Sequence, residues 1–216
     1  MCFNANISIT TFIIGVASII IGLINNTITY SFGLFYFSIV FMQFIEFLLW
    51  IYLNNDYVNN ILSIFASILL KIQLFALIFM LYFYNKMVSI LLFIIFCIYY
   101  IIIFNPKNTY KTIINNHTKT LEWLFLHNKN KDLYVSIIAY IILMSIILGS
   151  IYNYVNNNNY YKLLLVIFII LNIITFIYAT YHYFQYNTQA SIYCLSLNIF
   201  SFIIVIVSIY KNYHLL

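Results

Sequence analysis

Residues 61–104 read ILSIFASILLKIQLFALIFMLYFYNKMVSILLFIIFCIYYIIIF, two apolar runs separated by the pair Asn85-Lys86. An α-helix that crosses the hydrocarbon core of a bilayer needs about 20 mainly apolar residues. Both runs have about that length, and neither contains a proline or a glycine. The stretch therefore predicts two consecutive transmembrane helices, joined by a turn so short that the helices must be antiparallel neighbours.

The same pattern repeats on both sides of this stretch. The segments predicted to span a membrane are 7–24, 30–53, 61–84, 87–104, 133–155, 160–184 and 190–210. The predicted fold class is all-α: an integral membrane bundle of seven transmembrane helices with short loops, in a single domain over residues 1–216. No basic residue precedes the first segment, and the segment is long enough to span. It is therefore predicted to be a helix of the bundle rather than a cleavable signal peptide.

The composition excludes a soluble globular protein and indicates the lipid bilayer as the main partner. Hydrophobic residues make up 65% of the chain and charged residues 6%, and the mean hydropathy is +1.01. Soluble domains have roughly 25% charged residues. The nine lysines are scattered, mostly near helix ends, so the net charge of +5 does not indicate nucleic-acid binding.

The chain contains no arginine and is rich in Asn, Ile, Lys, Tyr and Phe. These residues are encoded by AT-rich codons, a bias typical of an AT-rich protist or of a giant DNA virus. A viral source would make the membrane a host-cell membrane.

The one long connection, 105–132, carries five lysines (107, 111, 119, 129 and 131), against three on the opposite side of the predicted bundle (86, 162 and 211). Cytoplasmic loops carry the excess of Lys and Arg, so this count predicts a cytoplasmic N-terminus. Within the loop, residues 121–126 (LEWLFL) are predicted to form a short interfacial helix, with Trp123 at the level of the lipid headgroups.

Small and polar residues at helical spacing indicate which helix faces point inward, because helices in lipid attract one another through close packing and shared polar groups. Three segments carry such stripes: Ser8, Thr11, Gly15, Ser18 and Gly22; Asn172, Thr175, Ala179 and His182; and Ser191, Cys194, Asn198 and Ser201. With Gln43, Glu46 and Trp50 in the second segment, these stripes predict that the first, second, sixth and seventh helices share an interior. The same kind of packing allows a helix-mediated oligomer.

The inward residues near the N-terminal side form the candidate polar pocket. Its predicted members are Gln43, Glu46, Trp50, His182, Cys194 and Asn198, with Cys2 near the mouth. At about 1.5 Å per residue, Glu46 lies about 10 Å from that side and Lys71 roughly 15 Å. An ionisable side chain within a membrane indicates function and is expensive unless it is paired. An ion pair between Glu46 and Lys71 is therefore predicted, and a purely structural role for the pair stays open.

Three functions are compatible with this pocket. The first is a non-enzymatic, seven-helix membrane protein of unknown biochemical role, with this polar pocket near its N-terminal face and no small-molecule ligand assigned. The second is a small transporter or channel in which Glu46 carries a proton or cation and Asn172 and Asn198 supply deeper polar steps. The third is a membrane-embedded enzyme or metal binder using Cys2, His182 and Cys194, residues with suitable ligand types but no diagnostic spacing. No catalytic residue, metal site or cofactor is assigned.

Two known seven-helix architectures do not fit. A retinal protein needs a lysine well inside its last helix, whereas Lys211 follows the predicted one. An intramembrane zinc hydrolase needs several histidines at one depth, and only His182 lies inside a predicted helix.

Three short motifs resemble a mostly bacterial family of uncharacterised multi-pass membrane proteins. They are MCFNANIS at residues 1–8, FMQFIEFLLW at 41–50 and SIYCLSLNIFS at 191–201. The corresponding motifs of that family, which these three segments resemble, are an N-terminal MCFSA, a QQ-x-x-E-x-x-x-W pattern in the second helix and a Trp-Cys-Phe pattern in the last helix. The matching residues are Cys2, Phe3, Gln43, Glu46, Trp50 and Cys194, and the departures are Asn4, Met42, Tyr193 and Leu195. The resemblance implies no activity and does not extend to Lys71.

Overall fold

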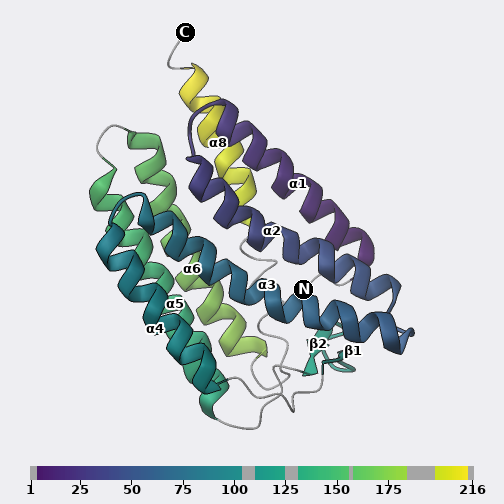
Figure 1. Ribbon diagram of the computed structural model, residues 1–216. Helices are drawn as coiled ribbons and strands as arrows, with labels where there is room; N and C mark the ends of the chain where they lie inside the picture. The colour runs from purple at the N-terminus through teal and green to yellow at the C-terminus, as the bar shows by residue number, and fades with distance from the viewer. Residues whose placement is uncertain (1–3, 104–109, 125–130, 156–157, 184–197, 214–216) are drawn as a thin grey trace.

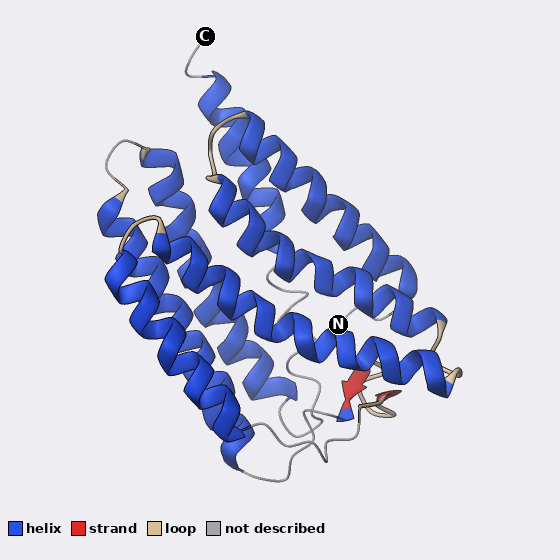
Figure 2. Cartoon of the chain, in the orientation of Figure 1, coloured by secondary structure: helices blue, strands red, loops and turns tan. Residues whose placement is uncertain are grey.

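The computed structural model describes residues 4–103, 110–124, 131–155, 158–183 and 198–213. This part of the chain contains seven helices and one β-hairpin (Figures 1 and 2). The helices are α1 (Ala5–Ile24), α2 (Tyr30–Ile51), α3 (Asp56–Tyr82), α4 (Lys86–Ile103), α5 (Lys131–Tyr154), α6 (Asn159–Tyr183) and α8 (Ile199–Tyr213). The strands are β1 (Thr112–Ile114) and β2 (Leu121–Trp123). The predicted all-α class is confirmed for the described residues. The last predicted segment, 190–210, differs: residues 190–197 lie outside the described residues, Asn198 is a turn residue, and α8 begins at Ile199.

Four helices in the described residues are long and apolar enough to cross a membrane: α1, α2, α3 and the part of α6 from Asn159 to Ala179. The apolar stretches of α4, α5 and α8 for which side chains are described are shorter, at Lys86–Ile98, Ile142–Tyr154 and Ile199–Tyr213. Large apolar side chains cover the outside of the helices; Met87 is 80% exposed and Ile24 is 73% exposed. A surface this apolar is compatible with a location in a membrane.

Helix α3 begins at Asp56, earlier than the predicted residue 61. The side chain of Asn55 accepts a hydrogen bond from the backbone N–H of Val58 at 3.1 Å, and Asp56 places a negative charge in the first turn. Both features stabilise a helix N-terminus. The polar residues that the hydropathy pattern assigned to a loop therefore form the first turn of the helix.

Neighbouring helices pack in sequence order, and α8 closes the arrangement (Figure 1). Helix α2 contacts α1 and α3, α3 also contacts α4 and α5, and α6 contacts α5. Helix α8 contacts both α1 and α6. The small residues of α1 allow α2 and α8 to approach this helix closely. A Cβ atom on Gly15 would lie 2.5 Å from Cγ1 of Val40, and one on Gly22 would lie 2.8 Å from Cγ2 of Ile204.

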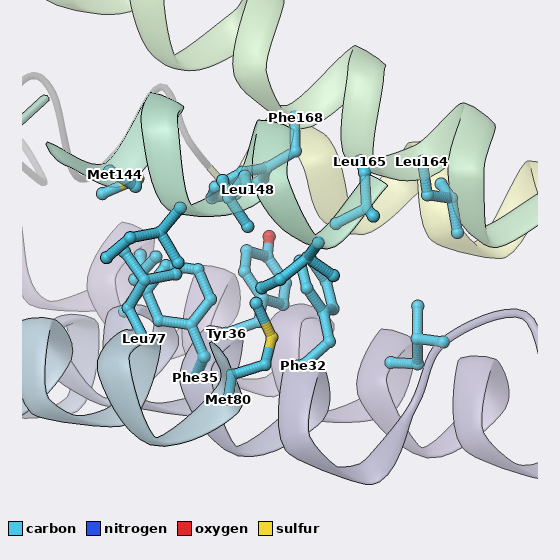
Figure 3. Close-up of a cluster of buried hydrophobic side chains, with 14 of the residues drawn as sticks. Phe32, Phe35, Tyr36, Leu77, Met80, Met144, Leu148, Leu164, Leu165 and Phe168 are labelled. Atoms are coloured by element: carbon cyan, nitrogen blue, oxygen red, sulfur yellow. The ribbon is translucent and has the colours of Figure 1, made fainter. Parts of the chain in front are cut away.

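An aromatic cluster fills the centre of the helix bundle (Figure 3). Phe32, Phe35 and Tyr36 of α2 pack against Phe168 of α6 and Phe200 of α8, and the Phe168 and Phe200 ring centroids are 4.9 Å apart. Aromatic pairs of this kind contribute about 0.5–1.5 kcal/mol beyond the area they bury. The cluster joins α2, α6 and α8, as predicted for helices that share an interior.

The connection at 105–132 differs from its prediction. Leu121–Trp123 form strand β2, paired antiparallel with β1, and not the start of an interfacial helix. Trp123 is 1% exposed and packs inside the protein, so it is not a side chain on the outer surface of an interfacial helix; its predicted depth at the level of the lipid headgroups stays a prediction. The turn between the strands explains the difference. The side chain of Asn115 accepts hydrogen bonds from the N–H groups of His117 and Thr118, and Lys119 adopts a left-handed conformation with φ 56°.

At the opposite end of the bundle, polar contacts tie the α1–α2 turn to α8 and α6. The Lys211 ammonium donates hydrogen bonds to the backbone carbonyls of Asn25 and Asn26, at 2.8 and 3.0 Å. The side chain of Asn158 donates to the same Asn26 carbonyl at 2.9 Å. The C-terminal end of α8 and the hairpin therefore lie at opposite ends of the bundle (Figure 1).

Candidate polar site within the bundle

The polar face of α2 is buried as predicted. Gln43 and Glu46 lie one helical turn apart, and both side chains are fully buried. Trp50, one further turn along, is half-buried. An acid with no exposed surface, on a helix that is long and apolar enough to span a membrane, is the strongest candidate for function in the described residues.

Helix α1 supplies the polar neighbours of this face. The Thr11 hydroxyl donates a hydrogen bond to Oε1 of Gln43 at 3.2 Å. The two helices are antiparallel, so the fully buried Ser8 lies level with Glu46. An open depression of about 250 Å³ is lined by Asn4, Asn6, Ile7, Thr10 and Thr11. It borders Thr11, and so lies next to the Thr11–Gln43 pair at the N-terminal end of α1.

Lys71 lies farther from the N-terminal side of the bundle, and farther from Glu46, than was predicted from the sequence. Gln73 donates a hydrogen bond to the carbonyl of Ser38 at 3.3 Å, which sets the register of the antiparallel α2–α3 pair. In that register Lys71 is level with Val40, six residues from Glu46, or about 9 Å of helix rise. Lys71 is half-buried and Glu46 fully buried. The ion pair between them stays a prediction, and it requires both side chains to extend along the helix axis.

Helix α8 adds a line of polar residues beside α1 and α2. The hydroxyls of Tyr36 and Ser201 share a hydrogen bond of 2.9 Å, and those of Thr27 and Ser208 share one of 2.8 Å. Asn198, the residue immediately before α8 and three residues before Ser201, is 5% exposed. The interface of α1, α2 and α8 that contains these residues is called the polar seam below.

The polar residues of α6 face in another direction. Asn172 and Thr175 are buried, as predicted, but the Asn172 amide donates to the sulfur of Met144 in α5 at 3.2 Å. The side chain of Asn172 therefore lies at the α5–α6 interface, whereas the aromatic ring of Phe168 packs against α2 and α8. The predicted shared interior is polar along α1, α2 and α8, and aromatic where α6 joins it.

The contribution of the hairpin to this site was not predicted from the sequence. Trp123 and Leu121 pack with Met42, Ile45 and Leu49, which directly precede Gln43, Glu46 and Trp50 on α2. The side chain of Asn59 in α3 makes two hydrogen bonds with Thr112, donating to its carbonyl at 2.8 Å and accepting from its N–H at 2.9 Å. The backbone N–H and carbonyl of Thr112 thus both bond to one side-chain amide, as they would to the backbone of a neighbouring strand. No sequence spacing indicates this contact.

Three predicted pocket residues fall outside this description. Cys2 and Cys194 lie outside the described residues, as does the side chain of His182. Within the described residues, no three His, Cys, Asp or Glu side chains are grouped to hold a metal ion. The metal-binding hypothesis, which depends on Cys2, His182 and Cys194, stays a prediction.

Comparison with protein-family models, with curated proteins and with solved structures finds no match to this chain.

Proposed function

We propose that this chain is a seven-span integral membrane protein that moves protons or small cations, with Glu46 as the ionisable group. The observation that carries the proposal is the complete burial of Glu46 on α2, next to the Thr11–Gln43 pair. A carboxylate is costly to bury in an apolar helix, and such residues mark ion pathways and proton relays in membrane proteins. In this proposal, protons enter at the open depression lined by Asn4, Asn6, Ile7, Thr10 and Thr11 at the N-terminal end of α1.

The proposal includes a topology. Four described helices have the length and apolarity of membrane spans, and the apolar character of α4, α5 and α8 supports three more. The five lysines of residues 105–132 support a cytoplasmic N-terminus. The absence of arginine supports a giant-virus or AT-rich protist source, and the three N-terminal, second-helix and last-helix motifs support membership of the multi-pass family described above.

The test is a proton flux measurement with purified protein in liposomes. After an acid pulse, vesicles that contain the wild-type chain should equilibrate faster than empty vesicles. Glu46→Gln keeps the size of the side chain but removes its ability to ionise. We expect this variant to lower the flux by about 100-fold or more, the lower end of what a positioned proton-transfer group contributes.

Glu122→Gln is the matched control, because Glu122 is also buried but lies in the hairpin, with Asn115 donating to it at 2.7 Å. Its flux should equal that of the wild type. Equal flux in the wild type and Glu46→Gln, or no wild-type flux above that of empty vesicles, would contradict the proposal.

A further inference from the structure

The polar seam runs almost the whole length of the bundle. Its bonded pairs are Thr27–Ser208 and Tyr36–Ser201, and then Thr11–Gln43, with Glu46 beyond. Along α1, the distance from Ser8 to Ile24, the last residue before the turn that contains Thr27, corresponds to about 24 Å of helix rise. The hydrocarbon core of a bilayer is about 30 Å thick. The seam therefore extends over most of the thickness of such a core.

Asn198 lies at a break in this series of pairs. Tyr36 and Gln43 are seven residues apart on α2, about 10 Å, so their pairs are too far apart to share a hydrogen bond. Asn198 precedes Ser201 by one turn, so it lies between the two pairs. Asn198 directly precedes α8, whose Ser201 and Ser208 hydroxyls bond to Tyr36 and Thr27 and therefore face α1, α2 and the turn between them.

The amide of Asn198 has unused hydrogen-bonding capacity. The side chain is 5% exposed, and neither Nδ2 nor Oδ1 has a hydrogen-bond partner among the residues that the structure describes. A buried amide without a partner costs about 1–3 kcal/mol. Buried water molecules typically satisfy such groups, each making about three hydrogen bonds.

We propose that Asn198 holds water in the polar seam and thereby joins the Thr11–Gln43 pair to the Tyr36–Ser201 pair. This inference rests on the proposed function and names its pathway. A proton released by the Glu46 carboxyl passes to a seam water, which releases one of its own protons to the next oxygen. The carboxylate is then protonated again from the N-terminal side. No other bond forms or breaks, and Asn198 acts as a positioning residue for the water.

Thiol accessibility tests the water directly and does not depend on transport. In a chain with Cys2, Cys97 and Cys194 replaced by alanine, Asn198→Cys is treated with a small charged thiosulfonate, and the product is measured by mass. Only a hydrated thiol forms the reactive thiolate. Thr175→Cys is the matched control, because Thr175 is also buried but its hydroxyl bonds to the carbonyls of Leu171 and Asn172 in its own helix, α6. We expect Asn198→Cys to be modified at least about tenfold faster than Thr175→Cys. A similar or slower rate at 198 overturns the inference.

Two further measurements keep the result interpretable. If Asn198→Cys does not fold, Ser201→Cys replaces a seam hydroxyl by a thiol of nearly the same size. Its modification rate is compared with that of the same control variant, and the same tenfold difference is expected. In the flux assay, Asn198→Leu should lower proton flux about tenfold, the equivalent of one lost hydrogen bond, and Thr175→Val should not. Rapid modification at 198 without any wild-type flux would refute the proposed function and leave the hydrated seam standing. Glu46-dependent flux with no modification at 198 would refute the seam alone.

Discussion

At the scale of single residues, the packing of α1 against α2 depends on the absence of a side chain at Gly15. Gly15 lets α1 approach the branched side chain of Val40, whereas Gly149 in α5 has no atom within 4 Å of the place where its Cβ would be. Both glycines lie inside helices, and only the first is explained by packing. The same close approach brings Thr11 within hydrogen-bonding distance of Gln43, so the geometry of the candidate site depends on Gly15.

We expect Gly15→Ala to lower the free energy of unfolding by about 1–3 kcal/mol, because valine has one preferred rotamer and moves aside with difficulty. Gly149→Ala should raise it by about 0.5–1 kcal/mol through helix propensity alone. Thermal unfolding in detergent micelles measures both. Val40→Ala should restore most of the loss when combined with Gly15→Ala. A loss that Val40→Ala leaves unchanged would show that another contact is responsible.

At the scale of elements, the hairpin is held to α3 mainly by one buried asparagine and not by its ion pair. Asn59 makes two buried hydrogen bonds to the backbone of Thr112, and Ser63 shares a third, of 2.8 Å, with the Thr112 hydroxyl. Lys111 and Asp56 form an ion pair at 2.8 Å, but their side chains are 41% and 82% exposed. Exposed pairs contribute about 0–1 kcal/mol, less than buried backbone hydrogen bonds whose partners would otherwise lack water.

Asn59→Leu is therefore expected to weaken docking of the hairpin by about 2–3 kcal/mol, the sum of two lost hydrogen bonds. In a Trp50→Phe background, Trp123 is the only tryptophan and reports on docking, because it is buried against α2 and α3. Its fluorescence should shift to longer wavelength and become accessible to acrylamide. Lys111→Gln should leave the emission unchanged. A shift of similar size in both variants would contradict this ranking of the contacts.

At the scale of the whole molecule, the contacts at the two ends of the bundle define which segments share a membrane face. The hairpin packs at the end that contains the α2–α3 turn, and Lys211 of α8 binds the α1–α2 turn at the other end. With seven crossings, these two ends lie on opposite sides of the bilayer. The positions of the hairpin tip and of the last residues of α8 therefore test the number of crossings.

We expect cysteines at Asn116 and Tyr213 to be labelled from opposite sides of a sealed vesicle by a membrane-impermeant maleimide. Asn116 is exposed at the tip of the hairpin, and Tyr213 is 77% exposed at the end of α8. Detergent permeabilisation, which exposes both sites, is the control for reactivity. Labelling of both sites from the same side of intact vesicles would rule out seven crossings.

How much of this the sequence could predict varies with the kind of interaction. Hydropathy predicted the boundaries of most described helices to within a few residues. It failed at Asp56, where polar residues form the first turn of a helix, and at the last helix, which was predicted from 190 whereas α8 begins at Ile199. Helical spacing correctly placed Ser8, Gly15, Gln43 and Glu46 on buried faces, because helices in an apolar bundle pack through their small and polar side chains.

The helical class of the chain and the burial of its polar stripes were thus determined by the sequence alone, since both follow from periodicity within one segment. Only the tertiary structure decided that Asn172 faces α5, that Lys71 is level with Val40 and that Trp123 is inside the protein. These features depend on the rotation and register of one element against another, and on contacts between residues such as Asn59 and Thr112 that are distant in sequence. The sequence of one segment does not specify which residues of another element its side chains contact.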